Sequence, residues 1–144
     1  MIDKYKTNAR IKKIFKKIEM EMEKYFGKEY TGFRGKEAVD KLLQEKNGFI
    51  PNAFIRNDIG WIGLVWGNDN LGLCHIIKRR GSQGVNIDEF LKDIDEVIER
   101  GSLKFNRNSN RFEISKNNKT VIISPTMKEE KFNFVVTAFE ICKK

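Results

Sequence analysis

The chain has 144 residues, with 28 Lys and Arg, 20 Asp and Glu, one His and a formal net charge of +8. This length predicts one domain, and a 40% hydrophobic content with 11 Phe supports a packed core rather than disorder. One His and two Cys are too few for a four-ligand zinc site of that type, and no stretch approaches the roughly 20 apolar residues of a membrane span.

The first half of the chain predicts two helices and one buried strand. Residues 7–26 carry an apolar stripe at helical spacing, flanked by lysines, and Gly27 ends it. This helix either packs on the domain with a solvated basic flank or docks on a membrane surface or on phosphates. Residues 36–46 predict a second helix, and residues 61–66 predict a buried strand followed by a turn.

The centre predicts two further helices, over residues 72–80 and 87–100. Asn86 is a good N-cap for the second of these, because its side chain can accept a hydrogen bond from the N–H of Glu89. Gly101 ends that helix.

From residue 103 onward the apolar period changes to two, which indicates strands. The Asn117-Asn118 pair predicts a two-residue hairpin turn, because Asn tolerates positive φ, and residues 125–131 predict a polar loop. The whole order of elements is typical of an α+β fold. The predicted strands are residues 103–107, 110–115, 119–124 and 132–141.

Basic charge is concentrated at the two ends of the chain. Residues 1–48 hold 13 basic and 8 acidic side chains, and residues 101–144 hold 9 and 4. A basic surface favours a polyanionic partner such as nucleic acid, although small domains also carry such charge for solubility.

The only histidine lies in a cationic turn. His75 precedes Lys78 and Arg79 by three and four residues, so these side chains share one face of the predicted helix. An imidazole can act as general acid or base near neutrality, and cations beside it can bind a phosphate. RNA cleavage by a 2′-hydroxyl needs this combination and needs no metal. The alternative is a histidine bonded to backbone beside a solvated helix end.

Three segments carry a family resemblance: IGLVWG at residues 62–67, GLCHIIKRR at 72–80 and VVTAFE at 135–140. Together they resemble the phage-type branch of the barnase, EndoU, colicin and RelE-like ribonuclease superfamily, over roughly residues 32–141. The resemblance implies N-terminal helices packed on a four- to five-stranded antiparallel sheet, with RNA across its open face. We therefore expect a ribonuclease-like toxin domain at residues 31–144, and an appended helix or a remnant of a longer protein at residues 1–30.

The resemblance also implies roles for single residues. His75 would be the acid/base group, Arg79 and Arg80 would hold the scissile phosphate, and Thr137 would touch or orient that phosphate. The remaining expected substrate contacts are Lys78, Arg111 and Lys119. The second proton carrier stays open among Glu113, Glu140, Lys119 and Tyr30.

These roles imply a metal-independent endoribonuclease toxin, without cofactor, that cleaves tRNA or other structured RNA and leaves 2′,3′-cyclic phosphate ends. The family further implies action in the bacterial cytoplasm, after delivery from another cell in interbacterial competition or as a phage-encoded part of a larger protein. A cognate, acidic immunity protein is the expected partner. A non-catalytic RNA-binding module and a phage or partner-interaction domain are the alternatives.

Overall fold

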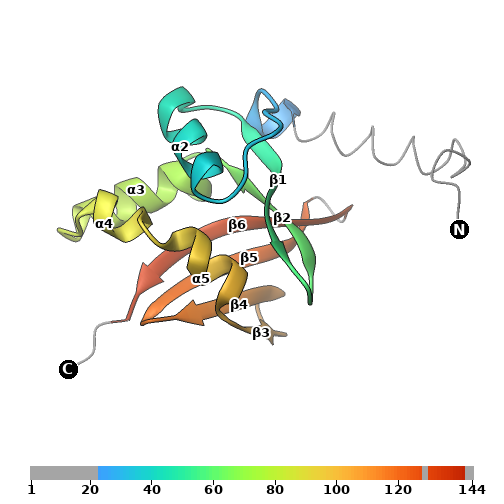
Figure 1. The fold of residues 1–144 in the computed structure, drawn as a ribbon, viewed down its shortest axis with the longest axis vertical. Helices are drawn as coiled ribbons and strands as arrows, with labels where there is room; N and C mark the ends of the chain where they lie inside the picture. The colour runs from blue at the N-terminus through green and yellow to red at the C-terminus, as the bar shows by residue number, and fades with distance from the viewer. Residues whose placement is uncertain (1–22, 128–129, 142–144) are drawn as a thin grey trace, which may run out of the picture.

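The computed structural model describes residues 23–127 and 130–141, and a six-stranded sheet forms its centre (Figure 1). The strand order is β1-β2-β6-β5-β4-β3. The helices are α2 (Lys36–Glu45), α3 (Gly72–Ser82), α4 (Ile87–Leu91) and α5 (Ile94–Arg100), and the strands are β1 (Phe49–Arg56), β2 (Gly60–Val65), β3 (Ser102–Asn106), β4 (Arg111–Lys116), β5 (Lys119–Met127) and β6 (Glu130–Glu140).

The α+β class is confirmed, but the expected sheet of four to five antiparallel strands is wrong. Residues 49–56, which the sequence did not mark as a strand, form β1 at the edge of the sheet. An edge strand tolerates Pro51, because a proline there costs no inner ladder hydrogen bond. β2 then pairs with β6 in parallel, with Gly63 opposite Phe134, which makes the sheet mixed.

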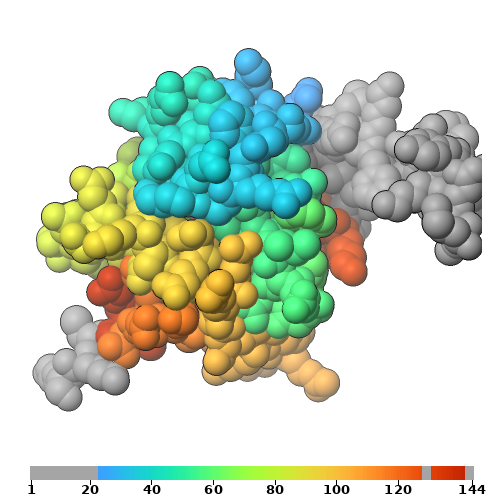
Figure 2. Space-filling view, viewed as in Figure 1, coloured from blue at the N-terminus to red at the C-terminus, as the bar shows by residue number. Residues whose placement is uncertain are grey.

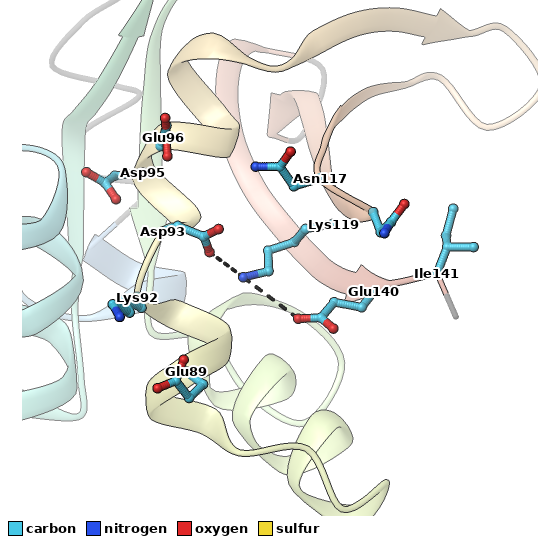
Figure 3. A pocket seen from close by; sticks show the side chains of 10 residues that line it. Glu89, Lys92, Asp93, Asp95, Glu96, Asn117, Lys119, Glu140 and Ile141 are labelled. Carbon is cyan, nitrogen blue, oxygen red and sulfur yellow. Dashed lines mark hydrogen bonds and ion pairs between the residues drawn. The ribbon is translucent and has the colours of Figure 1, made fainter. Parts of the chain in front are cut away.

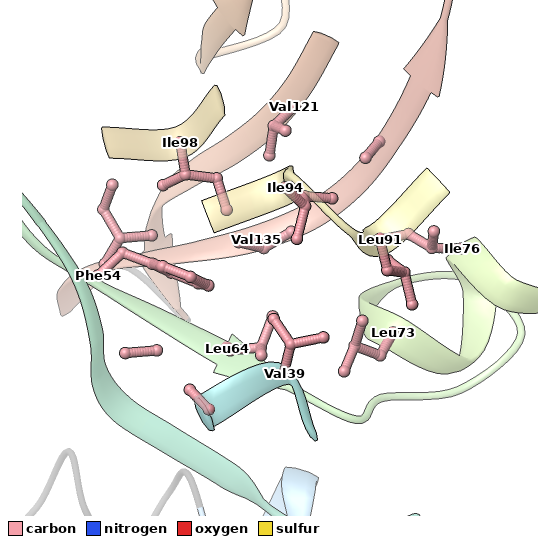
Figure 4. Close-up of a cluster of buried hydrophobic side chains, with 14 of the residues drawn as sticks. Val39, Phe54, Leu64, Leu73, Ile76, Leu91, Ile94, Ile98, Val121 and Val135 are labelled. Carbon is pink, nitrogen blue, oxygen red and sulfur yellow. The ribbon is translucent and has the colours of Figure 1, made fainter. Parts of the chain in front are cut away.

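The hydrophobic core lies between the sheet and the helices (Figure 4). Inward-facing residues of neighbouring strands, such as the paired Ile114 and Val121, belong to the same buried cluster as Ile94 and Ile98 of α5. In the space-filling view the helices cover the upper and left parts of the visible side, β1 and β2 are visible on the right in green, and later strands appear at the lower edge in orange (Figure 2). Among the described residues, no helix is long and apolar enough to span a bilayer.

The predicted helix over residues 87–100 is broken into α4 and α5. Its N-cap is confirmed, because Oδ1 of Asn86 accepts the N–H of Glu89 at 3.1 Å. The Lys119 ammonium donates to the carbonyl of Phe90, which in a continuous helix would accept the N–H of Ile94. A side chain that takes a helix carbonyl in this way interrupts the hydrogen-bond ladder.

The other face of the sheet carries a smaller apolar cluster. Phe134 of β6 packs there with Phe49 and with Phe26, whose ring centroid lies 5.7 Å from that of Phe134. Phe26 ends the last turn of the predicted helix over residues 7–26, of which residues 7–22 lie outside the described residues. The described part of the expected appendage therefore contacts the domain.

The meander follows the sequence closely. Lys116 pairs with Lys119 across the predicted two-residue turn, and Asn117 and Asn118 have φ of 52° and 68°. β5 and β6 run further than predicted, through Met127 and from Glu130, so the polar loop is shorter than residues 125–131.

A β-bulge divides β6 into two halves. Ile122 pairs with Thr137 and Ile123 pairs with Val135, so Val136 is one residue too many for the ladder. The bulge lets Val135 and Ala138 both face the core although they are three residues apart. Thr137 is left facing the other side of the sheet, as Phe139 is.

Candidate active site

A tight loop leads from β2 into α3. An added Cβ at Gly67 would lie 2.0 Å from the carbonyl oxygen of Leu71, and one at Gly72 would lie 2.7 Å from that of Trp66. Both glycines also have positive φ, so the loop needs glycine at both positions. The N–H of Cys74 donates to the Trp66 carbonyl at 2.8 Å, which fixes the start of α3 beside the end of β2.

His75 projects from the first turn of α3 to β6. Its Nδ1 lies 2.8 Å from the carbonyl oxygen of Asp69, and its Nε2 lies 3.0 Å from Oγ1 of Thr137. A carbonyl oxygen only accepts, so Nδ1 carries a proton. In the neutral ring Nε2 accepts from the threonine hydroxyl, and in the protonated ring it donates to that oxygen. The same contacts therefore suit both protonation states.

Two features of the sheet bring Thr137 to this position. β2 ends at Val65, and beyond that point α3 lies against β6. The bulge at Val136 turns the Thr137 side chain away from the core. Bulges recur beside active sites because they re-aim side chains in this way.

Asp69 supports the site twice. Its carbonyl holds His75, and its carboxylate pairs with Lys78, with Nζ 2.5 Å from Oδ1. The hydrogen bond from Lys78 lowers the pKa of Asp69, and the same bond raises the pKa of Lys78. Asp69 was not among the site residues predicted from sequence, and the signal that could have identified it was the turn directly before the cationic helix. Lys78 is near His75 as predicted, but its charge is already matched.

The two arginines of α3 differ in orientation. Arg79 is exposed and follows His75 by four residues, so it lies on the same side of the helix. Arg80 follows the buried stripe of Leu73 and Ile76. Its Nε is buried without an acceptor among the described residues. Burial and the neighbouring Arg79 lower the pKa of Arg80. A bound anion would supply both the missing acceptor and the missing counter-charge.

Lys119 and Arg111 are not brought to His75. Lys119 is only 5% exposed, and its ammonium binds Asp93, the Phe90 carbonyl and, at 3.9 Å, Glu140 (Figure 3). Arg111 begins β4, which β5 separates from β6. Its guanidinium donates to two carbonyls of the preceding turn, at 3.1 and 3.4 Å.

The other candidates for a second proton carrier are spread over the molecule. Tyr30 lies 3.4 Å from Oε1 of Glu45, near α2. Glu140 faces Lys119. Glu113 pairs across the sheet with Ile122, which pairs with Thr137, so Glu113 and Thr137 share one row and one face. With strands spaced by about 4.8 Å, two steps place their backbones about 10 Å apart.

The described residues bring no three His, Cys, Asp or Glu side chains together as metal ligands. Comparisons with curated proteins and with solved structures found no significant match. The family model of the phage-Barnase-EndoU-ColicinE5/D-RelE like nuclease 1 matches residues 53–144, which is more than half of the chain and includes His75 and Thr137. The resemblance seen in the sequence is thereby confirmed, and the chain belongs to this family of nucleases.

Proposed function

We propose that this chain is a metal-independent endoribonuclease in which His75 moves the proton of the attacking 2′-hydroxyl. The proposal rests on one observation: both ring nitrogens of the imidazole are hydrogen-bonded, Nδ1 to the Asp69 carbonyl and Nε2 to the Thr137 hydroxyl. Because Nδ1 donates to the Asp69 carbonyl, Nε2 is the ring nitrogen that we expect to accept and release the proton. Membership of a nuclease family supports a nucleic-acid substrate.

In the proposed reaction the 2′-hydroxyl replaces Thr137 at Nε2 and gives up its proton there. The 2′-oxygen forms a bond to phosphorus, and the bond from phosphorus to the 5′-oxygen breaks. The leaving 5′-oxygen takes a proton from the solvent, to which His75 later returns the proton that it accepted. The products are a 2′,3′-cyclic phosphate and a 5′-hydroxyl. Arg79, on the side of the helix that carries His75, binds the phosphate, and Arg80 adds positive charge from the more buried side. Together they stabilise the growing charge, so the leaving oxygen needs no strong second acid.

A cleavage assay with defined end analysis tests this proposal. We expect His75→Ala to lower the cleavage rate by roughly 10²–10⁴-fold, as the loss of a general acid or base does. Gln83→Ala, an exposed change at the end of the same helix, is the matched control and should cleave at the wild-type rate. Undiminished cleavage by the His75→Ala variant would refute the role of His75, and abolition of cleavage by EDTA would refute the metal-independent mechanism.

We further propose that the substrate in the cell is tRNA or another structured RNA and that the protein acts as a toxin. The bacterial cytoplasm is then the site of action, and an acidic immunity protein would cover the cationic face of α3. Induction of the wild type should stop growth, whereas His75→Ala should not. Sequencing of RNA ends from the induced cells would identify the target. Salt-sensitive binding of RNA that stays intact would support a non-catalytic module instead.

A further inference from the structure

A hollow of about 310 Å³ reaches β6 at Phe139, two residues beyond Thr137, on the sheet face that points away from α4 and α5. Its lining includes Lys104, Glu113, Ser115, Thr120 and Phe139, from four neighbouring strands. Ligand pockets begin at about 300 Å³, so the hollow suits one small planar group.

The strand register connects this hollow to His75. Phe139 is two residues beyond Thr137 on the same face of β6, which is a separation of roughly 7 Å. Phe139 pairs with Thr120, which pairs with Ser115, and this row forms the floor of the hollow. The next row runs from Glu113 through Ile122 to Thr137. A nucleotide joined to a phosphate at His75 can therefore place its base in the hollow.

The side chains of the hollow offer hydrogen bonds that the protein does not fully use. Oε2 of Glu113 accepts from Asn106 at 2.9 Å, but Oε1 is 3.6 Å from Nζ of Lys104, which is longer than a good hydrogen bond. This oxygen can accept from a ligand. The Ser115 and Thr120 hydroxyls are 2.9 Å apart, and only one of their two protons lies between them. Phe139 adds a partly exposed ring on which a base can stack.

We propose that this hollow binds the base next to the scissile phosphate and selects for an amino group on it. The proposal rests on the ribonuclease activity proposed above. The ring stacks on Phe139, and the amino group donates to Oε1 of Glu113, as amino groups of bases donate to carboxylates in protein complexes. Adenine, cytosine and guanine carry such a group, whereas uracil offers only its ring N3–H, so uracil is the disfavoured base.

Binding is tested without cleavage, by amide NMR of the His75→Ala protein titrated with the four nucleoside monophosphates. We expect shifts at Ser115, Thr120 and Phe139, with uridine monophosphate weakest by about tenfold. Phe139→Leu should weaken all four nucleotides by about tenfold through lost stacking. Phe105→Leu is the matched control, because Phe105 is an exposed ring on the opposite face, and it should leave binding unchanged. Absence of shifts at these amides with millimolar nucleotide would overturn the proposal.

Cleavage of short RNAs that differ in one base beside the cut tests selectivity. We expect Glu113→Gln to remove the preference against uracil while the pH profile of kcat/KM stays the same. If Glu113→Gln slows all four substrates equally and removes one limb of the pH profile, Glu113 is a proton carrier and the proposal fails. If the wild type cleaves no RNA, the proposed function fails, and the NMR titration still decides whether the hollow binds bases. Ser115→Ala serves as a second variant if Phe139→Leu does not fold. We expect the nucleotide-induced amide shift changes at Thr120 and Phe139 to be smaller in Ser115→Ala than in the protein that keeps Ser115.

Discussion

Two basic side chains meet β6 from different sides, and their surroundings differ. Lys119 is buried beside Asp93 and Glu140, so its ammonium faces two carboxylates. His75 is half-buried, and its ring faces a carbonyl and the Thr137 hydroxyl. Carboxylates favour one charge state of their partner, whereas a carbonyl and a hydroxyl accept a neutral or a charged ring. The first arrangement ties the α4–α5 junction to the sheet, and the second is compatible with the proton transfer that we propose for His75.

Replacing Lys119 should have the largest effect of the changes considered, and the effect should be a loss of folding stability. Lys119→Met leaves Asp93 and the Phe90 carbonyl without their donor. Because Asp93 is 38% exposed and only the carbonyl is buried, we expect the free energy of unfolding to fall by about 2–3 kcal/mol. Urea denaturation measures this loss. Lys116→Met is the control, because Lys116 pairs with Glu96 at 3.5 Å in a more exposed setting and should cost less than about 1 kcal/mol. If both variants lost similar amounts of unfolding free energy, the buried Lys119 ion pair would not differ in strength from an exposed one.

The second-largest effect is expected from a substitution in the loop between β2 and α3, which positions His75. Gly72→Ala forces a Cβ against the Trp66 carbonyl at positive φ, and we expect a cost of roughly 1–3 kcal/mol together with slower RNA cleavage. Gly84→Ala is the matched control, since Gly84 has a φ of +79° but open space around its Cβ. It should cost about 1 kcal/mol or less and leave cleavage intact. Thermal unfolding and cleavage rates of the two variants give the comparison.

The hydroxyl of Thr137 should matter for activity and little for folding. Thr137→Val keeps the shape of the side chain but removes the partner of Nε2, and we expect about a tenfold loss of cleavage rate. Thr137→Ser keeps a hydroxyl and should retain most of the rate. A Thr137→Val enzyme with the full wild-type rate would show that the hydroxyl does not position the ring.

The smallest effect concerns Asp58, which pairs with Arg56 at 2.9 Å away from both sites. The hydrogen bond from Arg56 lowers the pKa of Asp58, so its contribution to stability is present above the unfolded pKa near 4 and is lost as the pH falls through the folded pKa. The carboxylate is 46% exposed, so we expect Asp58→Asn to cost less than about 1 kcal/mol at pH 7. The cost should shrink below about pH 4, and a cost that is unchanged at pH 3 would contradict this origin.

The predictions from sequence succeeded where the cause is local. The Asn86 cap and the Asn117-Asn118 turn depend on neighbouring residues alone, and both are confirmed. Lys119 was expected to contact substrate, but its ammonium is buried against Asp93, 26 residues away at the break between α4 and α5. The anchor from Asp69 to His75 uses a backbone carbonyl, which no residue pattern marks. Long-range contacts and backbone acceptors therefore account for most of what the sequence did not predict.

The extra residue in β6 has a consequence for how this protein can change over time. Its presence sets which of Thr137 and Ala138 faces the histidine, because side chains alternate along a strand. An unbroken ladder built from the same residues would alternate from Val135, so Thr137 would turn into the core and Ala138 would face the histidine. Loss of Val136 would remove this bulge and keep Val135 inward and Thr137 outward. The direction of Thr137 thus depends on how many residues separate it from Val135, a number that replacements leave unchanged.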